Sequence, residues 1–311
     1  MNISIRAVRS IEDVRHFQAL QGMIWAAPPE DIVPVHVVIT VIQNGGGMVA
    51  AYDPNGPEET GGMVGLCFWF PGIGVPTTKD TIFTVRSGVI RTKICSHMAG
   101  VLPDWQGKGL GLKLKLAQRT AVLDQGMTDW MTWTYDPLFR INAVFNIRRL
   151  GAVCNTYKRN VYGVMTDALN AGVPSDRCQV DWWLRSDRVE ERLASGGRER
   201  SSAVTVTKEP LPDQARALHA HRMATTTSRS GYAAPVDDAP RLDGTPLLVP
   251  IPNDIAAIRR ADRELGMVWR HFMRHTLEAA FGAGYVVTDC LFLSSAGWHY
   301  LLEAQPPESN T

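Results

Sequence analysis

A glycine-rich run at residues 106–111 offers the clearest chemistry in the sequence, and it reads Gln106-Gly107-Lys108-Gly109-Leu110-Gly111. It follows an expected strand over 92–101 and opens an expected helix that ends at Gln125. A strand, a glycine-rich turn and a helix in succession leave backbone N–H groups unpaired at the positive end of the helix dipole. The glycines allow close approach and Lys108 adds a cation, so the run predicts a phosphate site.

Three classes of ligand compete for this run. A P-loop needs GxxxxGK[ST], which is absent here, so a nucleoside triphosphate is disfavoured. A Rossmann fingerprint needs GxGxxG, and Gly111 comes one place too early for its third glycine. This mismatch makes a dinucleotide-binding oxidoreductase a weaker alternative. An ordinary glycine-rich turn into a helix, without a ligand, is another alternative. The third pattern, Q/R-x-x-G-x-G/A, is met by Gln106, Gly109 and Gly111.

With this third pattern the chain resembles the GCN5-related N-acetyltransferase (GNAT) superfamily, whose loop holds the pyrophosphate of coenzyme A. Residues 97–103 resemble the family's fourth strand, which pairs with the pantetheine arm, and 142–151 resemble its short helix beside the thiol. The resemblance covers about residues 1–165 and includes the order of the elements. It implies acetyl-CoA or another acyl-CoA as cosubstrate, bound by Ala99, Val101, Gln106, Gly107, Lys108, Gly109, Leu110, Gly111, Asn142 and Phe145.

N-acyl transfer needs a base for the amine, a donor for the tetrahedral oxyanion and a proton for the departing thiolate. His97 is the candidate base because an ordinary histidine pKa near 6.5 suits proton removal at neutral pH. Its place nine residues before Gln106 also resembles a strand histidine of the arylalkylamine N-acetyltransferases. The resemblance implies the backbone N–H of Val101 as the oxyanion donor. A hydrogen-bonded core histidine is the alternative for His97.

The general acid is harder to place. Many family members have a tyrosine four residues before the glycine that ends the short helix, but Ile147 stands there in this chain. Tyr157 and Tyr162 are substitutes by residue type, with a half-buried structural role as the alternative for each. The thiolate can also leave without a dedicated acid.

Asp136 is the remaining candidate for the catalytic machinery. It ends an expected strand over 130–135, where it can pair with a substrate ammonium or assist His97. Capping a turn before Pro137 is the alternative. Asn142 is also a candidate cap of the short helix.

Composition excludes several classes of protein. The chain has 311 residues and a net charge of +1, from 32 Lys+Arg against 31 Asp+Glu, which gives no global field for nucleic acid or an anionic membrane. Five scattered cysteines argue against a disulfide framework, and His271 and His275 lack the glutamate of HExxH, so no metal site is expected. The absence of a long apolar run predicts a cytoplasmic protein without membrane segments.

The expected fold class is α/β, with a GNAT-like, mixed and mostly antiparallel sheet flanked by helices. A polar segment over 186–202 predicts a linker, which divides the chain into an acyl-CoA-binding domain over 1–190 and a smaller α+β lobe over 203–311. In that lobe, 254–281 predicts one long amphipathic helix whose apolar face packs on the first domain or another subunit. Residues 130–137 and 142–146 resemble a branch of predicted bacterial acyltransferases of this superfamily that carry an extra C-terminal lobe. The lobe of this chain is expected to be a degenerate GNAT-like half, a wall of the substrate pocket or a homodimer interface.

Further elements follow from local patterns. Ser10 predicts the start of a helix that runs to Met23, and Pro34 predicts another over 34–43, although the β-branched residues there also fit a strand.

These features predict an acyl-CoA-dependent N-acyltransferase that acts on a small-molecule primary amine in a ternary complex. A non-catalytic acyl-CoA-binding or regulatory protein is the first alternative, and the dinucleotide-binding oxidoreductase is the second.

Overall fold

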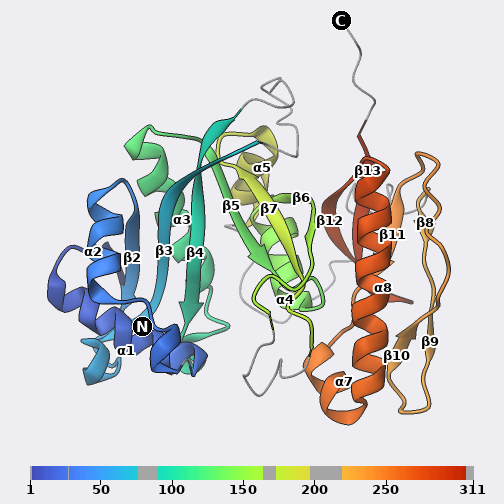
Figure 1. Ribbon diagram of the computed structural model, residues 1–311, viewed down its shortest axis with the longest axis horizontal. Coiled ribbons are helices and arrows are strands. Elements are labelled where there is room, and N and C mark those ends of the chain that lie inside the picture. The colour runs from blue at the N-terminus through green and yellow to red at the C-terminus, as the bar shows by residue number, and fades with distance from the viewer. Residues whose placement is uncertain (1, 27, 76–89, 164–172, 197–218, 306–311) are drawn as a thin grey trace, which may run out of the picture.

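The structure is a computed structural model that describes residues 2–26, 28–75, 90–163, 173–196 and 219–305. Its main feature is an eleven-stranded sheet with the order β1-β2-β3-β4-β5-β7-β6-β12-β13-β11-β8, flanked by helices (Figure 1). Neighbouring strands are antiparallel except for the pairs β4–β5 and β11–β8. The expected mixed, mostly antiparallel sheet is therefore confirmed.

The first part of the chain follows the predicted order of strand, helices, hairpin, strand, glycine loop, helix and strand. Its elements are β1 (Ser4–Ala7), α1 (Ile11–Trp25), α2 (Val35–Gln43), β2 (Gly47–Tyr52), β3 (Met63–Gly74), β4 (Arg91–Val101), α3 (Leu110–Gln125), β5 (Trp130–Tyr135), α4 (Arg140–Ala143), a π-helical turn (Val144–Arg149), β6 (Val153–Lys158) and β7 (Arg177–Trp183).

The second part adds strands to the same sheet. Its elements are α5 (Asp187–Gly196), β8 (His221–Arg222), β9 (Thr225–Thr227), β10 (Ala233–Pro235), β11 (Leu247–Pro250), α7 (Ile255–Ala261), α8 (Arg263–Gly282), β12 (Tyr285–Leu293) and β13 (Gly297–Ala304). Val287 of β12 pairs with Cys154 of β6, which joins the two parts. The division into 1–190 and 203–311 stays a prediction.

The linker prediction over 186–202 was wrong in its first half, because α5 begins at Asp187. Residues 197–202 lie outside the described part of the chain. The charged residues that suggested a loop are the exposed face of an amphipathic helix. Val189 is buried on its other face and Leu193 packs against the core, so tertiary burial decides for helix.

Helix boundaries agree with the local signals in two places. Ser10 Oγ accepts the N–H of Asp13 at 3.0 Å, as expected for the cap of α1. The segment after Pro34 is the helix α2, and the burial of Val38 against the core outweighs the strand preference of its β-branched residues.

The long helix expected over 254–281 is two helices. Asp262 has an extended backbone (φ −152°, ψ 93°), so it ends α7. Its carboxylate then accepts the N–H of Leu265 at 2.9 Å and caps α8.

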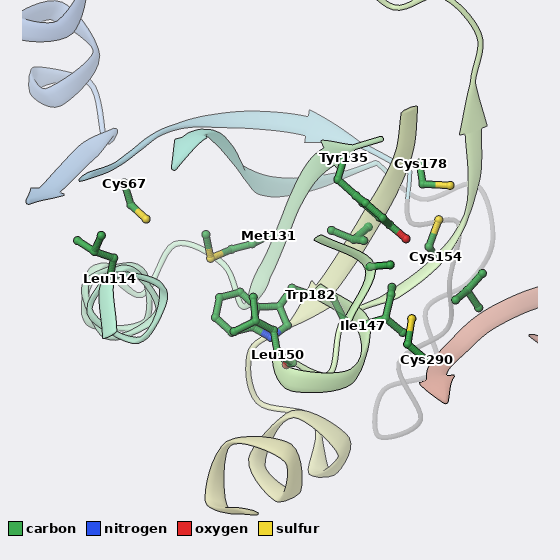
Figure 2. Packing of buried hydrophobic residues seen from close by; sticks show 14 of the residues in the cluster. Cys67, Leu114, Met131, Tyr135, Ile147, Leu150, Cys154, Cys178, Trp182 and Cys290 are labelled. Atoms are coloured by element: carbon green, nitrogen blue, oxygen red, sulfur yellow. The ribbon is translucent and has the colours of Figure 1, made fainter. Parts of the chain in front are cut away.

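A single large core spans both parts of the chain. Figure 2 shows Cys67 of β3 facing Leu114 of α3, and Cys290 of β12 beside Ile147 of the π-helical turn. The hydroxyl of Tyr135, at the end of β5, donates to the hydroxyl of Tyr300 at 3.1 Å. The C-terminal part therefore supports the strand that borders the candidate site.

The apolar face of α8 is buried within the chain, as predicted for packing on the first domain. The face comprises Trp269, Phe272, Met273 and Leu277. All five cysteines carry free thiols. Within the described ranges, no helix is both long and apolar enough to cross a membrane.

A buried ion pair also links the two parts. Asp136 Oδ2 lies 2.5 Å from Arg270 Nη2 of α8, and Arg259 and Arg177 approach the same oxygen at 3.7 and 3.9 Å. Asp136 Oδ1 accepts the N–H of Leu138 at 3.0 Å, which is the turn-capping role expected as the alternative. Arg270 has no exposed surface, so this pair is shielded from water.

Replacement of Arg270 by alanine is expected to lower the free energy of unfolding by about 3–5 kcal/mol, because it leaves the carboxylate of Asp136 buried without its closest cation. Urea denaturation of wild type and variant measures the change. Glu278→Gln, which breaks the exposed pair with Arg159, is the control and is expected to change stability little. Equal effects of the two variants would contradict the structural role of Asp136 and Arg270.

Candidate functional site

The parallel strands β4 and β5 pair over a short stretch only. Ile94 pairs with Met131 and Cys95 with Thr132, and the ladder then stops. Figure 1 shows β5 running away from β4 along the rest of its length. We call the unpaired stretches 96–101 and 133–135 the strand split. Because both strands run in the same direction, the split widens toward the end of β4, where the glycine loop begins.

His97 occupies a bulge in β4 at the narrow part of the split. Phe68 of β3 pairs with Met98 and Trp69 pairs with Ser96, which leaves His97 as the extra residue. The bulge places His97 on the face of the sheet that carries Phe68 and Phe70, whose ring centroids lie 6.1 and 5.6 Å from the imidazole.

This environment favours neutral His97. The residue keeps contact with solvent, but the surrounding side chains partly desolvate the ring and lower its pKa below the ordinary value. The imidazole is then uncharged at neutral pH and can accept a proton. The predicted base is thus accessible and in the required protonation state.

Backbone groups at the end of β4 are directed into the split. The N–H of Leu102 donates to Val64 O of β3 at 2.9 Å. Because backbone groups alternate along a strand, those of Val101 and Ala99 point away from β3 and toward the split. The carbonyl of Val101 accepts the side-chain amide of Gln106 at 2.9 Å, which ties the glycine loop to the strand.

The glycine loop has the conformation that its sequence predicts. Gly107 and Gly109 have φ values of +71° and +75°, which side chains rarely tolerate. A Cβ atom at either position would meet nothing within 4 Å, so the space outside the loop is open. Gly109 caps α3 without offering a side-chain acceptor, and the first turn of α3 has no acidic residue. The N–H groups of that turn are therefore available to an anion.

A cavity of about 160 Å³ lies beside this helix start, lined by Ile3, Trp105, Lys108, Leu110 and Lys113. Lys108 Nζ donates to the carbonyl of Asp104 at 2.5 Å, which fixes this cation at the loop. The glycine-rich pattern includes Lys108 but not Lys113 or Trp105. Lys113 lies three residues after Leu110 on the same helix face, a spacing that can identify it.

The short helix after β5 borders the split from its far side. Asn146 Oδ1 accepts the indole N–H of Trp133 at 3.2 Å, and the ring of Phe145 lies 3.9 Å from where a Cβ on Gly111 would be. Ile147 is fully buried, so a core residue fills the position at which the resemblance implies a tyrosine. The helix begins at Arg140, so the alternative that Asn142 caps it was wrong. Asn142 is exposed.

The two candidate tyrosines differ in environment. The hydroxyl of Tyr157 donates to the buried Asp176 at 2.8 Å, and burial raises the pKa of Tyr157 well above its ordinary value. The hydroxyl of Tyr162 lies 3.3 Å from Thr134 Oγ1 of β5, and 58% of the residue is exposed. The side chain of Trp133 faces α3, so the side chain of Thr134, the next residue along β5, points to the opposite face of the sheet. Tyr162, which contacts Thr134, therefore lies on the face that carries His97.

The structure brings His97, Ala99, Val101 and the glycine loop together around the strand split. It places Asp136 in the ion pair with Arg270, where both carboxylate oxygens are engaged. The catalytic roles of His97, Asp136 and Tyr157, and the cofactor contacts of the loop residues, stay predictions.

Solved structures with a similar fold include N-acetyltransferases. The enzyme from Staphylococcus aureus Mu50 is 13% identical with a TM-score of 0.41, over 60% of this chain and 100% of its own. NAA60 of Arabidopsis thaliana, solved with acetyl-CoA, is 13% identical with a TM-score of 0.42, over 58% and 99%. The ribosomal-protein-S18-alanine N-acetyltransferase of Escherichia coli is 14% identical with a TM-score of 0.40, over 58% and 92%.

These likenesses concern the fold alone. Structures named as members of the GNAT family are among the matches. No protein-family model matches the chain, and no curated protein matches it.

Proposed function

We propose that the protein is an acyl-CoA-dependent N-acyltransferase that transfers a short acyl group to a primary amine. The observation that carries the proposal is the strand split, which starts after Cys95 and Thr132 and widens toward a glycine loop at the N-terminus of α3. A long cosubstrate with an anionic end and an extended amide arm is complementary to this arrangement. The anionic end meets backbone N–H groups, and the arm meets an unpaired strand edge.

The glycine loop binds the pyrophosphate end of acyl-CoA, and the edge of β4 binds the pantetheine arm. The pyrophosphate is held by the first-turn N–H groups of α3 and by Lys108 and Lys113, which flank the neighbouring cavity. The pantetheine amides pair with the backbone of Ala99 and Val101 along the split. This arrangement carries the thioester toward the bulge at His97.

His97 then acts as the general base. It accepts a proton from the amine, whose nitrogen attacks the thioester carbon. The expected oxyanion donor, the N–H of Val101, lies at the wide end of the split, whereas the N–H of Ala99 also faces the split and is only two residues from His97. The N–H of Ala99 therefore donates to the tetrahedral oxyanion. When the carbon–sulfur bond breaks, the amide forms and the thiolate takes up a proton. Tyr162 is better placed than Tyr157 to supply it, because Tyr162 is exposed on the His97 face whereas Tyr157 donates to Asp176.

Release of the CoA thiol tests this proposal. Purified protein is mixed with acetyl-CoA and, in separate reactions, with amino acids, polyamines, aromatic amines and lysine peptides, and the free thiol is followed by a colorimetric reagent. The expected result is amine-dependent thiol release together with the mass of the N-acyl product. Saturable CoA binding without turnover on any amine would favour the non-catalytic alternative, and tight NADH binding without competition by CoA would favour the oxidoreductase.

A further inference from the structure

A buried lysine lies under the narrow end of the strand split. Lys115, on α3, is 3% exposed. Its Nζ donates to Ser96 Oγ at 2.8 Å and to Gln118 Oε1 at 3.0 Å, and it lies 3.7 Å from the ring centroid of Trp133. Ser96 and Trp133 are the first residues of β4 and β5 beyond the last pair of the ladder. The ammonium therefore bridges the two strands where they begin to separate.

The charge of Lys115 has no counter-ion in the part of the chain that the structure describes. Its contacts there are hydroxyl, amide and indole groups, and none is a carboxylate. Buried lysines are rare unless paired, because burial disfavours the charged form. Burial lowers the pKa of Lys115 to about 8, so the ammonium still predominates at neutral pH. An anion that reaches this position would supply the missing charge.

We infer that Lys115, together with Ser96 and Gln118, selects acyl groups that end in a carboxylate, such as succinyl or glutaryl. The inference rests on the proposed function, since it requires the thioester to lie in the split. Ser96, Lys115 and Trp133 meet on the α3 side of the sheet, so an acyl chain reaches their contact from the thioester by passing between β4 and β5 at the narrow end of the split. A terminal carboxylate there accepts a charge-assisted hydrogen bond, whereas a methyl end leaves the ammonium without an anion.

The competing explanation is that Lys115 only fastens α3 to β4 and β5. Its contacts with Ser96 and Trp133 would then stabilise the fold and have no influence on the acyl group. The two explanations differ in a measurable way, because only the first makes the relative affinity for two acyl-CoA species depend on Lys115.

Calorimetric titration with free CoA, succinyl-CoA and butyryl-CoA separates these explanations. The two acyl groups have equal chain length and differ in the terminal carboxylate. Wild type is expected to bind succinyl-CoA roughly 10- to 100-fold more tightly than butyryl-CoA, as one charge-assisted hydrogen bond allows. In Lys115→Met the ratio should fall to about one while the affinity for free CoA stays the same. Lys158→Met, which removes an exposed lysine on β6, should keep the wild-type ratio.

A measurement on wild type alone covers the case in which Lys115→Met does not fold. The succinyl-to-butyryl affinity ratio should decrease as the pH rises through and above about 8, because Lys115 then loses its charge. Cys67 of β3 is the other titratable group that acts on this ammonium, and burial raises its pKa to about 11, outside that window.

Two results would overturn the inference. Binding of CoA with no preference for succinyl-CoA, or with a preference that Lys115→Met leaves intact, would refute the role of Lys115 and leave the proposed function standing. Failure of wild type to bind any CoA species would refute the proposed function as well.

Discussion

Replacement of Gly109 by glutamate is expected to abolish the binding of coenzyme A, with a loss of affinity of at least roughly 100-fold. The new carboxylate would stand at the N-terminus of α3, where it competes with and repels the pyrophosphate. No atom within 4 Å obstructs a side chain at this position, so the effect should fall on the ligand site rather than on core packing. Calorimetric titration with CoA measures the loss.

Gly126→Glu is the matched control for this variant. Gly126 follows the C-terminus of the same helix, has a φ of +67° and likewise has nothing within 4 Å of an added Cβ. Both variants introduce the same side chain at a left-handed position, which costs roughly 1–2 kcal/mol of stability. Only Gly109→Glu should lose the ability to bind CoA. Wild-type affinity in Gly109→Glu would show that the loop is not the phosphate site.

The second large effect is expected for His97→Ala, which should lower kcat roughly 100- to 10,000-fold through the loss of the general base. KM for the acyl-CoA should change little, because the cosubstrate binds through the loop and the backbone of β4. The pKa of His97 lies below its ordinary value, so wild-type kcat should fall only as the pH drops below about 6.5. The low-pH decline should be missing from the variant.

His271→Ala provides the histidine control, because His271 is exposed on α8. It should keep the kcat and the pH profile of wild type. A His97→Ala variant with most of the wild-type kcat, or with an unchanged low-pH decline, would show that His97 packs beside Phe68 and Phe70 without taking the proton.

The elements that the sequence predicts well are those specified by neighbouring residues. The glycine loop is one example, since the positive φ values at Gly107 and Gly109 strongly favour glycine and depend on the local turn alone. The caps at Ser10 and Pro34 are also local, and they place the starts of α1 and α2 correctly. Such signals depend on a few consecutive residues, so the fold class and the candidate cofactor loop are accessible without a structure.

The features that escape sequence reasoning are made by residues far apart in the chain. Asp136 looks like a candidate for catalysis until Arg270, 134 residues later, is placed against it. Lys115 reads as an ordinary helix lysine, and only the packing of α3 on the sheet buries it beside Ser96 and Trp133. The bulge at His97 likewise depends on the register with β3.

The differences between the predicted and the observed helices have a related cause. The charged residues of α5 resemble those of a linker. Only the contact of Val189 with the core shows that this residue lies on the inner face of a helix. Asp262 breaks the predicted long helix because its side chain caps α8 better than it continues α7, a competition that composition and periodicity do not reveal.

A crystal structure of the complex with coenzyme A tests most directly whether the strand split is an acyl-CoA site. The pyrophosphate is predicted at the N–H groups of α3 beside Lys108 and Lys113, and the pantetheine arm between Ser96–Val101 of β4 and Trp133–Tyr135 of β5, with its sulfur near His97. Coenzyme A bound away from the glycine loop, or bound there with its arm outside the split, would contradict the proposed N-acyltransferase mechanism.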